Sequence, residues 1–408
     1  MKTLILITNT FPYGLPESSF LREEVKYLRE KFRLVIIARN IDNELYVPQP
    51  ADVVLHRYNA SKGYNPLILA LLSLCQRDFY KEIVNCKKQR KLRLASLVKI
   101  LRFMMRSMHF SKYLKSIIAS FADSDIIYYT YWNDYATYSC VTTKKDNQRV
   151  VSRLHGGDLY KLSINGYYLP FKDITNDKVD KLIFISEAGE KYYNSTYRNQ
   201  ADKSCVCRLG VLHRRGKTQF HNRESLKLVS FSYVRDIKRI DLIIDTLALI
   251  DNIEIEWVHI GAGYIFDKVL QYAHEKLDSK SNLRFEFKGY MKNDDALDYI
   301  NSVDFDFLIN TSSTEGLPMT MMEVMSMGIP VIGTDVGGVK EIITNGFNGY
   351  LLDANFSPSD LAKILMEYCF LPYEDKLFLR SNAFKMWKEK YNESVNFRHF
   401  VNDILLKL

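Results

Sequence analysis

One stretch of the chain decides the fold, and from Phe305 to Gly338 it reads FDFLINTSSTEGLPMTMMEVMSMGIPVIGTDVGG. An apolar strand ends near Asn310, and a Ser/Thr loop follows it. Gly316 and Pro318 then introduce a helix, because proline is harmless at the first helical position, where its missing amide would have no partner. A second apolar strand follows the helix. Strand, helix and strand in this order predict a parallel sheet flanked by helices.

The same alternation continues on both sides of this stretch. Short β-branched runs predict a first series of strands at Leu4–Thr8, Leu34–Ala38, Val53–His56, Ile126–Thr130, Val150–Leu154 and Leu182–Ile185. A second series is predicted at Leu228–Ser232, Ile255–Ile260, Leu283–Lys288, Phe305–Ile309 and Pro330–Gly333. We therefore expect two consecutive α/β domains, each with a doubly wound parallel sheet.

The length of 408 residues also exceeds that of one ordinary domain. We place the first domain at residues 1–212 and the second at 213–384. The polar segment Leu212–Ser225 is the expected linker between them, because it has no apolar periodicity. The tail reads as helical and is rich in aromatic residues, so helix 385–408 is expected to pack back on the first domain.

Composition narrows the class of protein. The hydrophobic content of 47% and the charged content of 25% are those of a globular protein. The net charge of +8, from 56 basic and 48 acidic residues, is compatible with anionic partners but selects none. The six cysteines are scattered and the apolar start of the chain reads as a strand, so we expect reduced thiols in a cytoplasmic protein. The longest uncharged apolar run, Pro66–Cys75, is half a membrane span.

The deciding stretch also carries candidate chemistry. The start of its helix points free backbone amides and a partial positive charge beyond the strand ends, which suits a phosphate group. Glu315 lies in the loop before this helix, and Glu323 lies five residues past Pro318, roughly 7 to 8 Å along the axis. Two carboxylates beside a phosphate site are suited to bind the hydroxyl groups of a sugar and a ribose. The alternative is a capping glutamate and a surface charge.

The Glu-x7-Glu spacing, with GIPVIGTDVGG and NGFNGYLL after it, resembles the donor site of retaining GT-B glycosyltransferases, specifically family four (group one glycosyltransferases). Supporting matches are SFSYVRDIKRIDLII (Ser230–Ile244), HIGAG (His259–Gly263) and FKGYM (Phe287–Met291), so the resemblance covers most of Leu228–Asp353. It implies two Rossmann-like domains facing across a cleft. It also implies a retaining, metal-independent transferase, with hexose as the expected sugar, that moves the sugar from a nucleotide-diphosphate donor to a glycan or lipid-linked acceptor in cell-surface polysaccharide biosynthesis.

The resemblance assigns roles to single residues. Glu315 is the expected catalytic contact to the donor sugar, Glu323 the ribose contact, and Lys238 a cation for the diphosphate. The family arginine position holds Tyr233, and Arg235 and Arg239 are nearby substitutes. The remaining donor-binding candidates lie around the helix start, at Gly316, Leu317, Met319 and Thr320.

Two elements of the first half resemble the family less closely. NTFPYGLPESSF (Asn9–Phe20) joins the first strand to a helix, and Gly14 in it is a donor-binding candidate, the alternative being a plain turn. In RLHGGDLY (Arg153–Tyr160), the resemblance makes His155 a catalytic residue that hydrogen-bonds the transferring sugar. Asp158 is a weaker candidate, and a structural role is the alternative for both.

Two other patterns favour a structural interpretation. Asp304-Phe305-Asp306 imitates a metal-binding Asp-x-Asp but stands at the start of a strand, so we expect no catalytic metal, and the resemblance implies no cofactor. The methionines at 319, 321, 322, 325 and 327 are expected to fill the core under the sheet.

The segment Arg77–Lys115 holds twelve Lys or Arg residues against Asp78 and Glu82, interleaved with apolar residues. Such a basic, partly amphipathic region favours an anionic membrane surface, so the protein is expected either free in the cytoplasm or peripheral on the inner face of the membrane. A solvated face ranks second, and nucleic acid, which we do not expect as a partner, ranks third. The rival functions are a GT-B phosphorylase or epimerase, which the Glu-x7-Glu spacing argues against, and a non-catalytic GT-B-fold binding or scaffolding protein.

Overall fold

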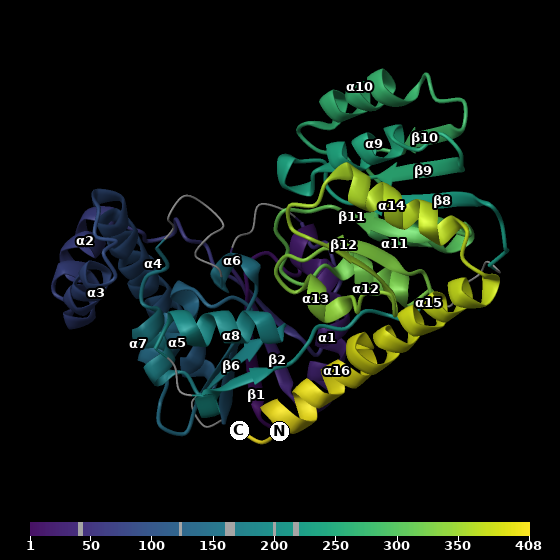
Figure 1. Ribbon diagram of the computed structural model, residues 1–408. Coiled ribbons are helices and arrows are strands. Elements are labelled where there is room, and N and C mark those ends of the chain that lie inside the picture. The colour runs from purple at the N-terminus through teal and green to yellow at the C-terminus, as the bar shows by residue number, and fades with distance from the viewer. Residues whose placement is uncertain (40–43, 122–124, 160–167, 199–200, 215–219) are drawn as a thin grey trace. The chain divides into compact units, whose positions relative to one another are not determined.

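The computed structural model covers residues 1–408 and describes all of them except 40–43, 122–124, 160–167, 199–200 and 215–219 (Figure 1). The chain divides into two compact units. Unit 1 consists of residues 1–208 and 397–408, and unit 2 consists of residues 209–396. Each unit is built on its own parallel sheet, and the prediction of two Rossmann-like domains is confirmed.

Unit 1 contains a seven-stranded parallel sheet of order β3-β2-β1-β4-β5-β6-β7. Its strands are β1 (Thr3–Thr8), β2 (Arg33–Ala38), β3 (Val54–Arg57), β4 (Ile126–Thr130), β5 (Arg149–Leu154), β6 (Lys181–Phe184) and β7 (Ser204–Val206). Every residue of β1 is buried, because helices cover both faces of the sheet.

Alternate residues of β1 supply the cores on the two faces, as the period of two in a strand requires. Ile5 and Ile7 pack with Phe110 and Leu114 on one face. Leu4 and Leu6 pack on the other face with Leu21 and with the chain end at Phe400, Val401 and Leu405. The C-terminal tail is thus part of the core of unit 1.

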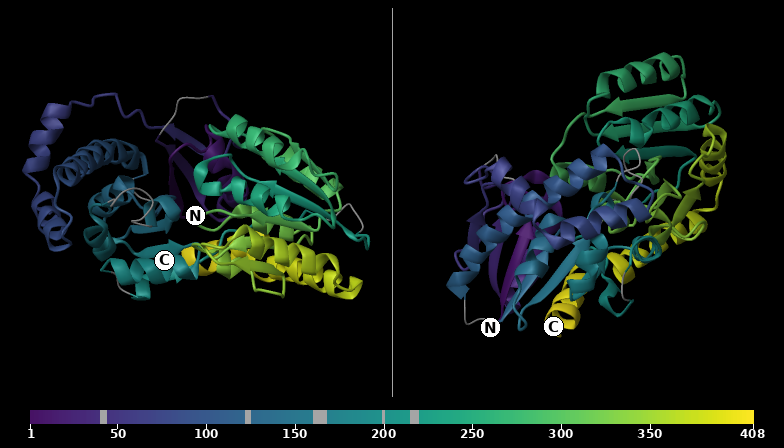
Figure 2. Two further views of the ribbon diagram at one scale, coloured as in Figure 1. Left: turned by 45° about the horizontal axis from the view of Figure 1, so that its top comes forward. Right: turned by 90° about the vertical axis from the view of Figure 1, so that its left-hand side faces the viewer.

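The helices of unit 1 follow the strands in the expected alternation. They are α1 (Leu15–Lys31), α2 (Pro66–Leu74), α3 (Arg77–Lys88), α4 (Leu94–Ile118), α5 (Tyr135–Thr143), α6 (Gly156–Leu159), α7 (Lys172–Lys178) and α8 (Glu187–Thr196), with short turns η1 (Ala119–Phe121) and η3 (Ala201–Lys203). Helices α2 and α3 lie outside α4, away from the sheet of this unit (Figures 1 and 2). Among the described residues, no helix is both long enough and apolar enough to cross a membrane.

Unit 2 contains a six-stranded parallel sheet of order β10-β9-β8-β11-β12-β13. Its strands are β8 (Ser225–Phe231), β9 (Glu254–Ile260), β10 (Leu283–Phe287), β11 (Phe307–Asn310), β12 (Val331–Thr334) and β13 (Gly349–Leu352). Its helices are η4 (Asp236–Lys238), α9 (Ile240–Ala248), α10 (Phe266–Leu277), α11 (Asn293–Ser302), α12 (Met319–Met325), α13 (Val339–Ile342), α14 (Pro358–Cys369), α15 (Tyr373–Met386) and η5 (Trp387–Tyr391). The last helices, α16 (Glu393–His399) and η6 (Phe400–Leu405), lead into unit 1.

All eleven predicted strands are present, with ends within three residues of those predicted. Sequence analysis missed β7 and β13, which have only three and four residues. The division between the units falls after Arg208 and after Asn396. Residues 385–396 stay with unit 2, because Trp387 Nε1 donates to the carbonyl of Val211 and the amide of Val211 donates to the carbonyl of Tyr391.

The described residues of the predicted linker Leu212–Ser225 pack against unit 2. His213 stacks on Trp387 at 4.9 Å, and Arg214 forms ion pairs with Asp294 at 2.5 Å and Asp298 at 3.0 Å. Ser225 already begins β8. Residues 215–219 of this prediction lie outside the described part of the chain.

Candidate functional site

The sequence-predicted residues gather at the carboxyl ends of the two sheets. In unit 2 the strand order reverses between β8 and β11, and in unit 1 it reverses between β1 and β4. Loops that leave two strands in opposite directions open a crevice at such a point, which is where open α/β sheets bind ligands. Each unit therefore presents one candidate site of its own.

In unit 2 the structure brings Lys238 and Glu315 together. The Nζ of Lys238 lies 2.6 Å from Oε1 of Glu315, and Nδ2 of Asn310 donates to the same oxygen at 3.1 Å. The loop after β8 is held against the loop after β11, because the hydroxyl of Thr311 donates to the carbonyl of Lys238 at 3.0 Å. The ion pair is mostly shielded, with side chains 15% and 11% exposed.

Gly337 fixes the backbone at Glu315. Its φ of 56° lies in the left-handed region that glycine adopts readily, and a Cβ there would lie 1.8 Å from the carbonyl oxygen of Glu315. The amide of Gly338 also donates to the carbonyl of Gly316 at 2.8 Å. The TDVGG segment thus holds the glutamate loop in place.

The helix after this loop begins close to where it was predicted. Pro318 is the N-cap of α12, which has seven residues. Leu317 is buried, while Met319 and Thr320 are half-buried at the helix start. Four of the five clustered methionines are buried, as expected for core residues: Met321, Met322, Met325 and Met327.

Glu323 lies further along α12 and faces α11. Its Oε1 accepts a hydrogen bond from Nδ2 of Asn293 at 3.1 Å. Burial raises the pKa of its carboxyl above the usual value, while Asn293 and the charge of Arg214 act in the opposite direction. This carboxylate keeps acceptor capacity for a ligand hydroxyl, since only one hydrogen bond to it is found among the described residues.

The two arginines near the missing family arginine differ in availability. Arg235 is exposed and lies over the exposed ring of Tyr233, 6.0 Å from the ring centroid. Arg239 is committed to the fold, because its guanidinium donates to the carbonyls of Thr311 at 2.6 Å, Ala354 at 2.8 Å and Ser312 at 3.2 Å. Arg239 is therefore a poor substitute for the family arginine. Arg235 remains the candidate for that position.

In unit 1, His155 stands directly after β5 in an aromatic setting. Its ring lies 4.5 Å from that of Tyr131 and 4.6 Å from that of Trp132. Both ring nitrogens are buried, and neither has a hydrogen-bond partner of ordinary geometry within the described part of the chain. Burial, and then the charge of Arg153, lower the pKa of His155 to about 3. The imidazole is thus uncharged at neutral pH.

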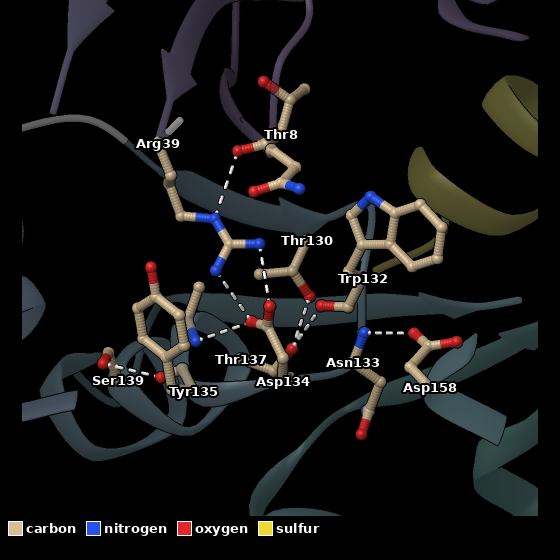
Figure 3. Close-up of polar contacts among 12 residues, drawn as sticks. Thr8, Arg39, Thr130, Trp132, Asn133, Asp134, Tyr135, Thr137, Ser139 and Asp158 are labelled. Atoms are coloured by element: carbon tan, nitrogen blue, oxygen red, sulfur yellow. Dashed lines mark hydrogen bonds and ion pairs between the residues drawn. The ribbon is translucent and has the colours of Figure 1, made fainter. Parts of the chain in front are cut away.

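Asp158 holds the backbone of His155 in place. Its carboxylate accepts the backbone amide of Asn133 at 2.6 Å (Figure 3) and that of His155 at 2.6 Å. Burial raises the pKa of Asp158 to about 6. Lys172 donates to the backbone and side-chain oxygens of Asn133 at 2.5 and 2.6 Å. Burial lowers the pKa of Lys172 to about 8. Sequence analysis missed Lys172, which stands in a polar helix without any motif.

The loop after β1 binds its own carboxylate. Glu17 accepts the backbone amides of Asn9 at 2.9 Å, Thr10 at 2.5 Å and Phe11 at 2.8 Å, and also the indole N–H of Trp132. A Cβ at Gly14 would lie 2.6 Å from Cβ of Thr10, so packing within the loop explains this glycine. These amides are occupied, and the role of Gly14 in donor binding stays a prediction.

A partly buried ion pair connects three strand ends of unit 1. Arg39, after β2, donates to both carboxylate oxygens of Asp134 at 3.0 and 2.8 Å and to the carbonyl of Thr8 at 3.1 Å (Figure 3). Asp134 follows β4 and caps α5, since it accepts the amide of Ala136 at 2.9 Å. Nothing in the sequence pattern links these residues, which are 95 positions apart.

Asp304 and Asp306 both form ion pairs with Arg223. Arg223 donates to Asp304 at 2.7 Å and to Asp306 at 2.8 Å, and Tyr368 donates to Asp306 at 3.1 Å. Both aspartates are buried. They connect β8, β11 and α14 of unit 2, and their role in this arrangement is structural.

Comparisons with known proteins agree with this arrangement. Residues 216–385 match the family model of glycosyl transferases group 1. A relative named as an uncharacterized glycosyltransferase of Methanocaldococcus jannaschii is 28% identical over 343 residues, which cover 82% of this chain and 89% of the relative.

Two solved structures share the fold over the full length of both chains. The HepE protein of Anabaena, crystallised with UDP, is 16% identical with a TM-score of 0.67. The lipopolysaccharide outer core galactosyltransferase WaaB is 17% identical with a TM-score of 0.67. The two units have the GT-B fold of these structures. The match to the group 1 glycosyltransferases lies in residues 216–385, and the comparisons do not favour the non-catalytic alternative.

Proposed function

We propose that this protein is a retaining, metal-independent glycosyltransferase that moves a sugar from a nucleotide-diphosphate donor to a glycan or lipid-linked acceptor in cell-surface polysaccharide synthesis. The observation that carries the proposal is the pair of Lys238 and Glu315 at the reversal point of the sheet in unit 2. The UDP bound to the Anabaena protein and the lipopolysaccharide named for WaaB support the donor and acceptor classes.

The pair suggests how the donor is handled. Lys238 is a compact positive charge, suited to neutralise a diphosphate. When a diphosphate takes over the ammonium group as its partner, the carboxylate of Glu315 becomes free to accept hydrogen bonds from sugar hydroxyls. As the bond from the anomeric carbon to the diphosphate oxygen breaks, the electron pair stays on the diphosphate, and Lys238 stabilises that charge.

The other site residues complete this assignment. Glu323 takes the ribose, which the family resemblance implies and its remaining acceptor capacity permits. Arg235 and the backbone from Gly316 to Thr320 contribute to donor binding. His155 offers a neutral ring nitrogen to the transferring sugar, since its lowered pKa keeps it uncharged. Asp158 holds the backbone amide of His155, and Lys172 holds Asn133, whose amide donates to the same Asp158.

We also propose that the segment Arg77–Lys115 binds an anionic membrane surface. Ten of its twelve basic residues are exposed. Of its two acidic residues, Glu82 is buried and Asp78 pairs with Lys81 at 3.0 Å. The charge on the surface of this segment is therefore almost entirely positive, which attracts anionic headgroups.

A thermal-shift screen tests the donor assignment. UDP, GDP, ADP and their sugars are added one by one, and a donor should raise the unfolding temperature by mass action, by about 2.7 kcal/mol in stability at a hundred times Kd. Slow hydrolysis of the same nucleotide sugar then shows catalysis. A screen without any stabilising nucleotide would overturn the donor assignment, and binding without hydrolysis or transfer would favour a non-catalytic protein.

A further inference from the structure

Helix α2 is apolar but adds almost nothing to the core. It reads PLILALLSL, and Ser73 is its only buried residue. Leu67 is 77% exposed and Leu71 is 67% exposed, and they stand one helical turn apart. Three further apolar residues of the helix are also largely exposed: Ile68, Leu72 and Leu74. A continuous aliphatic surface on a nine-residue helix needs a partner, because soluble proteins rarely leave one open to water.

The neighbouring helices extend this surface. On α3, Tyr80 and Val84 are exposed one turn apart, and on α4 Leu94 is 79% exposed. The helices α2, α3 and α4 pack on one another, and α2 and α3 form the outer end of unit 1 (Figures 1 and 2). We name this set of exposed apolar residues on α2, α3 and the start of α4 the aliphatic face.

Basic residues border the aliphatic face on the same helices. Arg77, Lys81 and Lys88 are exposed on α3, at three or four positions from Tyr80 and Val84, so they share one side of the helix. On α4, Arg102 and Arg106 continue the line of Leu94 at intervals of four residues. The face thus presents aliphatic side chains next to a cationic border.

We propose that the aliphatic face inserts into the interfacial layer of an anionic lipid bilayer, with α2 as the inserting helix. This deepens the proposed membrane association and rests on it, but not on the donor chemistry. Lipid chains accept leucine side chains, and anionic headgroups neutralise the border. Helix α2 spans only about 13 Å against about 30 Å of hydrocarbon, so it lies in the plane of the interface.

Two other occupants of the face are a second copy of the chain, which charge disfavours, and single-stranded nucleic acid, which the type of side chain disfavours. A second copy of the chain would bring the same cationic border against itself, which repels. Single-stranded nucleic acid stacks its bases on aromatic rings, whereas Tyr80 is the one aromatic residue among those named for the face and the exposed apolar side chains of α2 are aliphatic. Both alternatives are outcomes of the test.

Vesicle sedimentation measures the partition of the full chain. Wild type should bind phosphatidylglycerol vesicles more tightly than phosphatidylcholine vesicles. The double variant Leu67→Gln/Leu71→Gln should lose roughly tenfold or more in partition, because each leucine gives up most of its apolar burial. The matched control Leu249→Gln/Phe370→Gln changes two side chains of unit 2 that are 54% and 67% exposed, and should bind as wild type.

A fluorescent label on Cys75 reports directly whether α2 inserts into the bilayer. It is the exposed C-cap residue of α2, whereas Cys86, Cys140, Cys207 and Cys369 are buried. An environment-sensitive maleimide dye on Cys75 should shift its emission to the blue on anionic vesicles and be quenched by lipids brominated on their chains. The variant Cys75→Ser corrects for labelling elsewhere.

The outcomes separate the possibilities. Wild-type partition of the Leu67→Gln/Leu71→Gln variant, or no emission shift in protein that sediments with vesicles, would overturn the insertion of α2. A concentration-dependent dimer that the double variant abolishes would assign the face to a second copy, and tighter binding to RNA than to vesicles would assign it to nucleic acid. Nucleotide-induced stabilisation is measured on the same samples, so a failed donor assignment is recognised separately.

Discussion

The ammonium group of Lys238 lies 2.6 Å from the carboxylate of Glu315, although the two residues are 77 positions apart in the chain. Among the described residues, neither side chain forms an ion pair with any other residue. A ligand that enters this site must therefore offer an anion to Lys238 and hydrogen-bond donors to Glu315. A sugar joined to a diphosphate offers both.

Replacing Lys238 should weaken donor binding and turnover together. Lys238→Ala removes a charge-assisted contact of roughly 1.5 to 3 kcal/mol, so kcat/KM should fall about ten- to hundredfold. Lys238→Arg should recover part of the loss, because it restores the charge but not the compact shape. Steady-state kinetics with the donor found in the screen measure this. The control Lys363→Ala changes a 73% exposed lysine of the same unit, and equal activity of Lys238→Ala and this control would contradict the assignment.

The two glutamates should differ in what they affect. Glu323→Ala should weaken nucleotide binding, because it removes a ribose contact made throughout the reaction. Glu315→Ala should mainly lower kcat, because it removes a contact to the reacting sugar. Each loss should amount to about ten- to hundredfold. Nucleotide titration and kcat measured side by side distinguish the two effects, and wild-type values in both variants would refute the donor site.

Activity should survive EDTA, because positive charge at the diphosphate is assigned to Lys238 and backbone amides. The assay compares the rate before and after chelation. Complete loss that Mg²⁺ or Mn²⁺ restores would show that a metal takes part and would reopen the role of Asp304 and Asp306.

Arg223 should matter for stability and not for chemistry. Arg223→Gln breaks its pairs with the buried Asp304 and Asp306, which typically costs about 3 to 5 kcal/mol. Chemical denaturation measures the loss in unfolding free energy. Arg284→Gln, at an exposed position of β10, is the control and should change it little. Equal stability of the two variants would contradict a structural role of the Arg223 pairs.

Glu82 should make the stability of unit 1 depend on pH. Burial raises the pKa of its carboxyl from 4.5 to about 7, although Tyr168 and the amide of Phe171 donate to it. Because the folded-state pKa is raised, its contribution is fully present below about pH 4.5 and is lost as the pH rises to about 7. Relative to Glu82→Gln, wild type should lose up to about 1.4 kcal/mol per pH unit in this range.

Urea unfolding at several pH values measures this difference. The exposed Glu44→Gln serves as the control and should run parallel to wild type. A constant difference between wild type and Glu82→Gln from pH 4.5 to 7 would contradict the raised pKa.

The fold could be predicted because its signals are local. A β-branched run such as LVII in β2 is buried on both faces wherever it lies in the sheet, and every predicted strand of five or more residues was found. Sequence analysis missed β7 and β13, which have three and four residues and stand at the edges of their sheets. Lys238, Glu315, Glu323 and His155 were predicted from short motifs that resemble the family, and their roles stay predictions.

The sequence alone thus determined the two parallel sheets, the glutamate spacing and the family resemblance, because near neighbours along the chain carry these patterns. Only the tertiary structure decided the partners of charged residues. Glu17 accepts hydrogen bonds from the loop after β1, Arg39 pairs with Asp134, and Arg239 donates to three backbone carbonyls. Such contacts form when crossover connections bring distant strand ends together, and no local period records which ends will meet. The exposure of α2 belongs to the same class, since an apolar helix becomes a binding surface only where folding leaves it uncovered.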